Sequence, residues 1–350
     1  MKMLIKGNDA VCAAAIAAGC KAFYGYPITP QNEIPEYMSA KMAEAGGVFI
    51  QAESEVAAIN MVYGAAAAGV RVMTSSSSPG MALKQEGISY LAAARLPAVI
   101  VSVMRCGPGL GGILPSQADY FQATKGGGNG DYYTPVYAPN SVQESMDLMM
   151  KGFNVADKYR TPVIIVLDGT LGQMMEPAEV KDIPRHKVDI SEYATNGESG
   201  KRGKRNTVNS LNLDAYALER SNQLLGSVYD KIRQDEVMYE STVKDGDEIA
   251  LAAYGVPARI ALQAIDELGA KGIKAGLVRP ITLWPFPDKA FELPSSVKAV
   301  LVCELSMGQM LYDVRLAVNG RLPVHFYGRT GGVIFEPVEL VEKAREILGR

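Results

Sequence analysis

Apolar residues in the first half of this chain follow two alternating patterns, short apolar runs and longer segments with helical periodicity. The runs at 97–104 and 162–169 are continuously apolar, which is typical of strands buried on both faces. Regular alternation of strands and helices predicts a mostly parallel sheet covered by helices on both faces. We expect strands at 21–27, 48–51, 70–75, 97–104 and 162–169, and helices at 8–18, 31–45, 54–69, 80–94 and 141–160.

A polar stretch at 186–210 interrupts this pattern, and a second α/β series follows it. The stretch contains the basic run GKRGKRN at 200–206, which we interpret as a solvated loop. The chain therefore divides into a first domain (1–185), a linker with a connecting helix (186–246) and a second domain (247–350). Beyond the polar stretch we expect a charged helix at 214–236, strands at 248–255, 273–280 and 297–304, and helices at 257–272 and 336–348.

The composition is that of an ordinary globular protein. The chain has 350 residues, of which 48% are hydrophobic and 21% charged, and its formal net charge is −3. That length is comfortable for two domains, and the slight negative charge offers no basic surface for nucleic acid or for an anionic membrane. No apolar stretch approaches the roughly 18 residues that a membrane span needs. We therefore expect neither nucleic acid nor a membrane as a partner.

Cysteine usage bounds the metal chemistry and the compartment. Cys12, Cys20, Cys106 and Cys303 form no Cys-x-x-Cys pair, so we expect neither a structural zinc nor an iron–sulfur cluster on this chain. Free thiols and the lack of a signal-peptide pattern favour a reducing cytoplasm.

Three polar residues fall just past the ends of expected strands. Thr29 lies between Pro27 and Pro30, Arg105 follows the apolar run at 97–104, and Asp168 lies near the end of the run at 162–169. Ligands of parallel α/β sheets bind beyond the carboxyl ends of the strands. These positions are the first sign of a binding site.

Arg105 also adjoins the glycine-rich segment GPGLGG at 107–112. This segment matches G-x-G-x-x-G formally, but Pro115 follows it and no helix opens within its glycines, which argues against a dinucleotide site. We interpret it as a loop that lets backbone approach a ligand. Arg105 is then either an ordinary structural arginine or a clamp for a carboxylate, which guanidinium binds in bidentate fashion.

Glu53 and Glu55 open the expected helix at 54–69. They could simply be solvated acids that complement the helix dipole. Residues two apart do not share a helix face, so at most one of them points into a site. The Ala and Gly residues that follow allow close helix packing, which favours a buried setting for one carboxylate.

Four motifs occur in an order and spacing that resemble one known family over essentially the full length. They are YGYPITPQNEIPE, QAESEVAAI, VMRCGPG and AGLVRPITLWPFP. Together they resemble the alpha chain of the 2-oxoacid:ferredoxin oxidoreductases, and within that family the 2-oxoisovalerate type. The resemblance implies an α/β protein with a pyrimidine-type thiamine diphosphate-binding domain, followed by a transketolase C-terminal-like domain. It also implies oxidation of a 2-oxoacid with coenzyme A and ferredoxin to give acyl-CoA, carbon dioxide and reduced ferredoxin.

The resemblance assigns roles to the residues already singled out. Glu55 would hydrogen-bond a ring nitrogen of the cofactor's aminopyrimidine and promote deprotonation of the thiazolium carbon. Thr29 and Arg105 would bind the 2-oxoacid, with Thr29 held rigidly by its two prolines as a preorganised donor. Pro27 and Ile28, from the same motif, would line the cofactor.

One departure from a complete thiamine enzyme implies partner subunits. Enzymes of this kind hold the diphosphate through Mg²⁺ on a Gly-Asp-Gly segment, which this sequence lacks. The diphosphate half of the site, with Mg²⁺ and [4Fe-4S] clusters, would come from a beta subunit. A gamma subunit, a ferredoxin-like delta subunit and ferredoxin itself would complete the system. Coenzyme A would be the co-substrate.

Alternatives remain at this point. The substrate could be 2-oxoglutarate or pyruvate, or the chain could be the thiamine subunit of a lipoamide-linked 2-oxoacid dehydrogenase, which shares both domains. A non-enzymatic scaffold subunit is the third possibility. The sequence does not decide among them.

Overall fold

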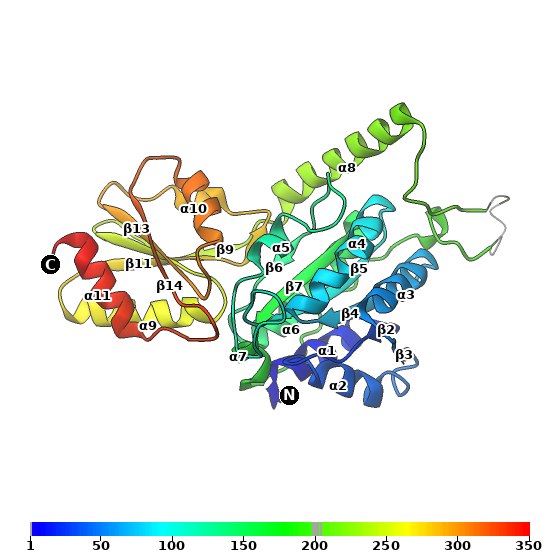
Figure 1. The fold of residues 1–350 in the computed structure, drawn as a ribbon, viewed down its shortest axis with the longest axis horizontal. Helices are drawn as coiled ribbons and strands as arrows, with labels where there is room; N and C mark the ends of the chain where they lie inside the picture. The colour runs from blue at the N-terminus through cyan, green and yellow to red at the C-terminus, as the bar shows by residue number, and fades with distance from the viewer. Residues whose placement is uncertain (1, 198–202, 204) are drawn as a thin grey trace.

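Two α/β sheets organise the chain in the computed structural model, which describes residues 2–197, 203 and 205–350 (Figure 1). Parts of the basic run at 200–206 (200–202 and 204) lie outside the described residues. The expected α/β architecture is confirmed. No helix within the described ranges is both long enough and apolar enough to cross a membrane.

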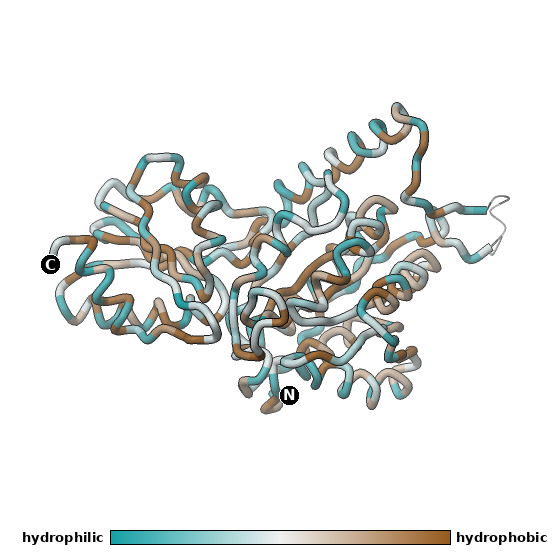
Figure 2. The backbone as a smooth tube through the Cα atoms, in the orientation of Figure 1, coloured by the Kyte–Doolittle hydropathy of each residue, from teal (hydrophilic) through white to brown (hydrophobic). Residues whose placement is uncertain are grey.

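The first sheet has seven strands in the order β12-β6-β7-β5-β4-β2-β3. All its neighbours pair in parallel except β12 and β6. Its central strands are the fully buried, continuously apolar runs that the sequence pattern indicates, and they are brown in Figure 2. The strands are β2 (Ala22–Gly25), β3 (Val48–Gln51), β4 (Val72–Ser76), β5 (Ala98–Met104), β6 (Val136–Tyr137), β7 (Pro162–Asp168) and β12 (Thr282–Trp284).

Helices cover both faces of this sheet. The helices α3 (Glu55–Ala67) and α4 (Ser78–Ala93) pack together on one face, and α1 (Gly7–Ala17) packs with α2 (Glu33–Lys41) and α6 (Val142–Tyr159) on the other. Side-chain caps fix two of the starts, since Ser54 and Ser141 accept from the backbone of the first turns of α3 and α6. The predicted helix at 31–45 is shorter than expected, because the chain turns after Lys41. Shorter elements are α5 (Tyr120–Thr124), α7 (Gly169–Gln173) and the ribbon of β1 (Met3–Lys6) with β8 (Met175–Ala178).

The second sheet has five strands in the order β14-β13-β10-β11-β9, parallel except for the edge strand β9. The helices α9 (Val256–Ala270) and α11 (Pro337–Leu348) cover one face, and α10 (Met310–Val318) covers the other (Figure 1). A separate apolar core lies beneath α9 and α11. The strands are β9 (Tyr239–Ser241), β10 (Ile249–Ala252), β11 (Ala275–Pro280), β13 (Ala299–Glu304) and β14 (Val324–Gly328).

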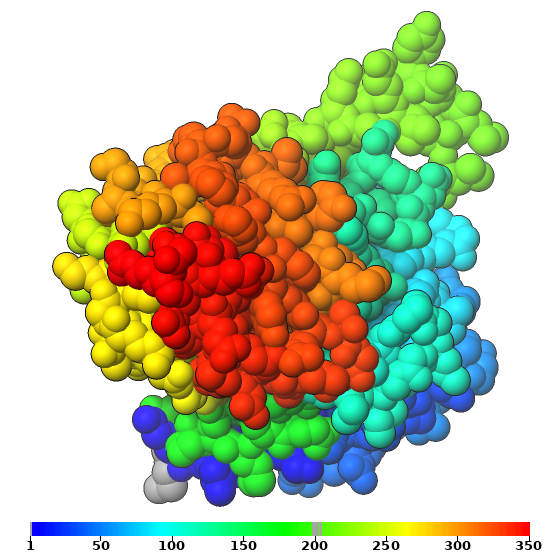
Figure 3. Space-filling model, turned by 60° about the vertical axis from the view of Figure 1, so that its left-hand side comes forward, coloured from blue at the N-terminus to red at the C-terminus, as the bar shows by residue number. Residues whose placement is uncertain are grey.

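The two sheets exchange elements across the boundary expected at residue 247. The edge strand β9 precedes that boundary yet belongs to the second sheet, whereas β12 follows it and joins the first. The helix α8 (Ala215–Asp235) follows the polar stretch, and its first turns project from the body (Figures 1 and 3). The division into residues 1–185, 186–246 and 247–350 therefore stays a prediction. In the fold, each half contributes one strand to the sheet of the other half. Two 3₁₀ turns, η1 (Ile190–Glu192) and η2 (Asp288–Phe291), complete the description.

Candidate active site

The first sheet has a switch point between β2 and β4. The strand β3 lies on one side of β2, whereas β4, β5 and β7 follow on the other. Open α/β sheets bind ligands in the crevice outside the carboxyl ends of the strands at such a point. Thr29 follows β2, and Ser76 ends β4. Helix α3 contacts both strands and begins with Glu55, so three polar positions converge on this crevice.

Arg105 and Thr29, far apart in the sequence, are joined directly. Arg105 is buried, and its Nη1 donates to the backbone carbonyl oxygen of Thr29 at 3.0 Å. Its Nη2 donates to the carbonyl oxygen of Leu110 at 2.8 Å, which ties the glycine-rich loop over the guanidinium. The Nε of Arg105 is buried and has no hydrogen-bond partner in the described chain. The guanidinium is thus held at both terminal nitrogens, and its Nε–H stays free.

The loop itself depends on glycine. Gly111 has φ +60°, and a Cβ there would lie 1.8 Å from the carbonyl oxygen of Cys106. No other residue fits this turn without moving the backbone. The turn leaves Leu110, Ile113 and Leu114 exposed, Leu110 by 79%.

Glu55 is buried although it begins a helix, whereas Glu53 is exposed. The spacing argument therefore selects Glu55 as the inward carboxylate. Gly80 makes room for it, since a Cβ at Gly80 would lie 2.5 Å from Oε1 of Glu55 and 2.1 Å from Oγ of Ser76. Among the described residues, the Glu55 carboxylate accepts no hydrogen bond. A buried carboxylate with unused acceptor capacity is prepared for a ligand.

Several residues of this crevice were not singled out from the sequence. The hydroxyls of Ser76 and Ser77 are buried without a hydrogen-bond partner in the described chain. The signal was present as the run of four serines before Pro79 and Gly80, at the end of an apolar strand and the start of a helix. Polar residues at the end of a buried strand indicate the same crevice as Thr29 and Arg105.

Asp119 links this serine run to Arg105. The hydroxyl of Ser78 accepts from the backbone N–H of Arg105 at 2.9 Å and donates to the Asp119 carboxylate. Burial raises the pKa of Asp119 to about 6, and the hydrogen bond from Ser78 and the charge of Arg105 oppose that rise. A carboxylate that titrates near neutral pH therefore lies beside the guanidinium.

The remaining predicted positions differ in their surroundings. Asp168 is a helix cap, because its Oδ1 accepts from the backbone N–H groups of Thr170 and Leu171 at 2.9 and 3.0 Å. Pro27 is exposed and Ile28 half-buried. The ligand-binding roles of Pro27, Ile28, Thr29, Glu55 and Arg105 stay predictions.

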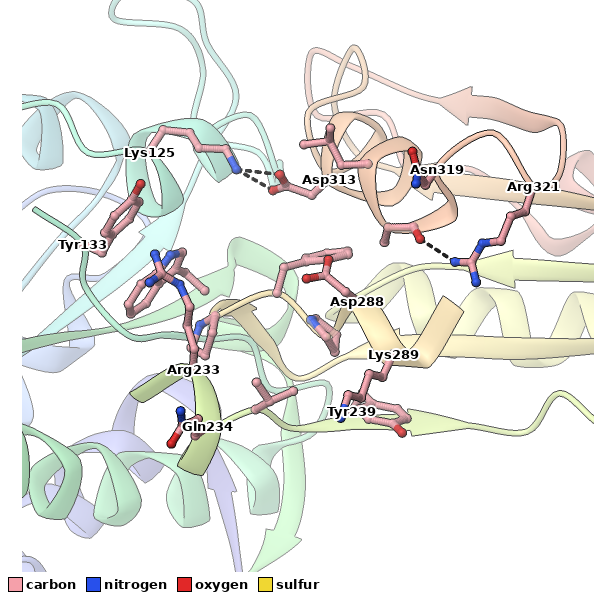
Figure 4. A pocket seen from close by; sticks show the side chains of 17 residues that line it. Lys125, Tyr133, Arg233, Gln234, Tyr239, Asp288, Lys289, Asp313, Asn319 and Arg321 are labelled. Carbon is pink, nitrogen blue, oxygen red and sulfur yellow. Dashed lines mark hydrogen bonds and ion pairs between the residues drawn. The ribbon is translucent and has the colours of Figure 1, made fainter. Parts of the chain in front are cut away.

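A separate cavity of about 1120 Å³ opens between the two halves (Figure 4). Tyr133 and Trp284 stack in it with centroids 4.9 Å apart, and Arg233 lies over both rings. Lys125 and Asp313 pair across it at 2.6 Å. Lys125, Asp313, Arg233 and Arg321 have partners in the described chain, in contrast to the Glu55 carboxylate. Within the described ranges, no group of three or more His, Cys, Asp or Glu side chains could hold a metal ion.

Comparison with known proteins places both halves. Residues 13–244 match the family model described as pyruvate flavodoxin/ferredoxin oxidoreductase, thiamine diP-binding, and residues 247–340 match pyruvate:ferredoxin oxidoreductase core domain II. The chain is 50% identical to ketoisovalerate oxidoreductase subunit VorB of Methanothermobacter marburgensis, covering 99% of this chain and 98% of that one. It is 35% identical to 2-oxoglutarate synthase subunit KorA of the same organism, covering 97% of each.

Solved structures of similar fold are found in the same family and among transketolases. A 2-oxoglutarate:ferredoxin oxidoreductase from Magnetococcus marinus, solved with 2-oxoglutarate, coenzyme A and succinyl-CoA bound, superposes with a TM-score of 0.89 at 26% identity. The superposition covers 99% of this chain and 65% of that longer chain. A split-gene transketolase shares the fold, with a TM-score of 0.59 at 14% identity over 99% of this chain and 98% of that one. The chain belongs to the 2-oxoacid:ferredoxin oxidoreductase family.

Proposed function

We propose that this chain is the alpha subunit of an enzyme that converts a branched-chain 2-oxoacid and coenzyme A to acyl-CoA and carbon dioxide, with electrons passed to ferredoxin. The observation that carries the proposal is the arrangement of Arg105 and Thr29 beside a buried carboxylate that no described group satisfies. The 50% identity to a ketoisovalerate oxidoreductase subunit supports the branched-chain substrate.

The residues of the crevice divide the work of binding. Arg105, already held by two carbonyl oxygens, presents its free Nε and guanidinium edge to the substrate carboxylate. The Oγ1 of Thr29 accepts from Nδ2 of Asn32 at 3.2 Å, so its hydroxyl proton is available to the 2-oxoacid. Both donors are positioned before substrate arrives, which is what electrostatic stabilisation requires.

The environment of Glu55 fits the aminopyrimidine of thiamine diphosphate. The unpartnered buried carboxylate and the free hydroxyl of Ser76 lie together over Gly80, and they provide an acceptor and a neighbouring polar group for the ring. When bound, this cofactor supplies the thiazolium carbanion chemistry that breaks the bond between carboxylate and carbonyl carbons. Glu55 would hold a proton at the pyrimidine ring nitrogen. Pro27 and Ile28 would line the same space.

Partner subunits complete this proposal. We expect Mg²⁺, the diphosphate-binding half and [4Fe-4S] clusters on a beta subunit, with gamma and ferredoxin-like delta subunits in the same assembly. The relatives' names as subunits support an assembly of several chains. We expect this assembly in the cytoplasm.

Substrate preference tests the proposal. Between Arg105 and Lys125 there is no Lys, Arg or His, and Lys125 is paired with Asp313. A distal carboxylate, as in 2-oxoglutarate, would meet the apolar side chains of Leu110, Ile113 and Leu114 and find no counter-charge on this loop. The assembled complex should therefore show kcat/KM for 2-oxoisovalerate about 10–100 times that for 2-oxoglutarate. A higher kcat/KM for 2-oxoglutarate would refute the branched-chain assignment.

A further inference from the structure

A buried lysine lies behind the candidate site. Lys84, on α4, has 0% of its surface exposed. Its Nζ donates to Oγ1 of Thr74 at 3.2 Å and to the backbone carbonyl oxygen of Glu55 at 3.4 Å. Among the described residues it forms no ion pair. Lysine is almost never fully buried unless it is paired, so this position needs a reason.

The position of Lys84 relative to Glu55 supplies that reason. Gly80 is the residue of α4 over which the Glu55 carboxylate lies. Lys84 is four residues further along the helix, on the same face and one turn deeper. Its ammonium group contacts the backbone carbonyl oxygen of Glu55, while the Glu55 side chain packs against Gly80.

The charges of the two residues are coupled through this geometry. Burial lowers the pKa of Lys84 to about 8, and the negative charge of Glu55 opposes that effect. Each charge alone would be costly in this dry environment, whereas together they are neutral. Because the contact of Lys84 is with the backbone of Glu55, the carboxylate keeps its acceptor sites free. A direct ion pair would have occupied them.

We propose that Lys84 is a positioning residue for Glu55, which fixes the first residue of α3 through its carbonyl and supplies a compensating positive charge without using the hydrogen-bonding capacity of the carboxylate. This inference rests on the proposed function, because it gives Lys84 a part in turnover only if Glu55 acts on the cofactor.

Turnover of the assembled complex gives the first test. Lys84→Met removes the charge and both donors, and Lys84→Gln removes the charge but keeps a donor. Both should lower kcat by about 10–100-fold, as expected when a reacting group is misplaced, with KM for 2-oxoacid and coenzyme A unchanged. Thr74→Val is the matched control, since it removes the other acceptor and leaves the ammonium group and its contact to Glu55. It should lower kcat far less.

A double-mutant cycle separates positioning from general packing. In a Glu55→Gln background, Lys84→Met should lower kcat little further, because the charge that it supports is gone. An equal fold-change in both backgrounds would overturn the proposal.

The same cycle on thermal unfolding of the chain without cofactor requires no activity. The double variant Glu55→Gln/Lys84→Met should unfold at a higher temperature than Lys84→Met alone, because no uncompensated carboxylate remains. Additive shifts would overturn the charge coupling. If the shifts are coupled but Glu55→Gln alone retains full turnover, the proposed function of Glu55 fails while the coupling stands. Should Lys84→Met not fold, Lys84→Gln carries the same cycle.

Discussion

Each sheet has a switch point where the strand order reverses. The polar groups at the second one are hydrogen-bonded within the chain, whereas several of those at the first one are not. In the second sheet the order reverses between β10 and β13. Gln117, from the first half of the chain, fills that crevice: its Nε2 donates to the carbonyl oxygen of Tyr254 at 2.9 Å, and its Oε1 accepts from the N–H of Leu305 at 3.0 Å. In the first sheet the described chain buries Glu55 but supplies no hydrogen-bond donor to its carboxylate.

A buried glutamate in each crevice makes the difference measurable. Glu304 ends β13 with 0% exposure, and its carboxylate accepts from three backbone N–H groups, those of Gln309, Met310 and Leu311, at 2.9–3.0 Å. The hydroxyl of Ser306 donates to it at 2.9 Å. Glu304 is therefore a cap for α10, whereas Glu55 accepts nothing within the described residues. Unused hydrogen-bonding capacity, rather than burial, distinguishes the candidate site from the structural one.

The largest contrast should appear in cofactor binding. The isolated chain, which carries no metal-ligand cluster among its described residues, should bind thiamine diphosphate with Mg²⁺ weakly or not at all. The complex with its partner subunit should bind tightly. Titration calorimetry with and without the partner measures this. Tight, Mg²⁺-dependent binding by the chain alone would show that the diphosphate site is misplaced.

Conservative substitution of the two glutamates should separate activity from stability. Glu55→Gln should lower turnover of the complex by about 10²–10⁴-fold, and it should lower the unfolding temperature only through the loss of its charge coupling to Lys84. Glu304→Gln should instead lower the free energy of unfolding by about 1–3 kcal/mol, because an amide NH₂ would replace an acceptor that the backbone donors need.

Glu53→Gln is the control for the first variant, since Glu53 is exposed and lies two residues before Glu55. Loss of turnover in Glu53→Gln with near-full activity in Glu55→Gln would reverse the assignment. Kinetics of the complex and thermal unfolding of the chain supply both readings.

Two buried arginines, Arg279 and Arg105, differ in the same way as the two glutamates, and we expect a smaller effect on turnover from their substitution. Arg279 is saturated by carboxylates, with Nη1 and Nη2 donating to Glu144 at 2.9 and 2.8 Å and Nε donating to Glu240 at 2.9 Å. Arg105 contacts only carbonyl oxygens through its side chain and keeps Nε free. Arg105→Ala should therefore lower kcat/KM for the 2-oxoacid by about 10–150-fold, the equivalent of about 1.5–3 kcal/mol.

The same Arg105→Ala variant should leave KM for coenzyme A unchanged, whereas Arg279→Ala should mainly destabilise the fold by leaving Glu144 unpaired. Arg105→Lys tests the geometry, because it keeps the charge but loses the planar fork. An unaltered dependence on 2-oxoacid concentration in Arg105→Ala would remove its role as a clamp.

Sequence patterns carried the central elements of the fold but not the connections between its halves. The buried strands β5 and β7 can be predicted from the sequence because each is an apolar run. The short strands β6 and β12 are not, because two or three residues carry no periodicity and their pairing is a tertiary event.

The same limit applies to the site. Thr29, Glu55 and Arg105 could be named from strand ends and a motif, whereas Lys84 could not. Its burial depends on where α4 packs against α3, which the local sequence does not reveal.

The smallest expected effect concerns the charge beside Arg105. The pKa of Asp119 is raised above its ordinary value of 3.8 to about 6, chiefly by burial. A raised carboxyl pKa means that the folded chain holds this proton more tightly than the unfolded one, so the stabilising contribution is complete below about pH 4 and is lost as pH rises through about 6.

Asp119→Asn keeps an oxygen for the Ser78 hydroxyl and carries no charge. Relative to the native chain, it should raise the unfolding temperature by a few degrees at pH 8 and by less at pH 5. The charge of Arg105 opposes the rise in the pKa of Asp119, so in an Arg105→Ala background the pH at which the difference develops should move upward. Thermal unfolding between pH 5 and 8 measures both effects, and a difference that does not vary with pH would show that Asp119 does not titrate beside the clamp.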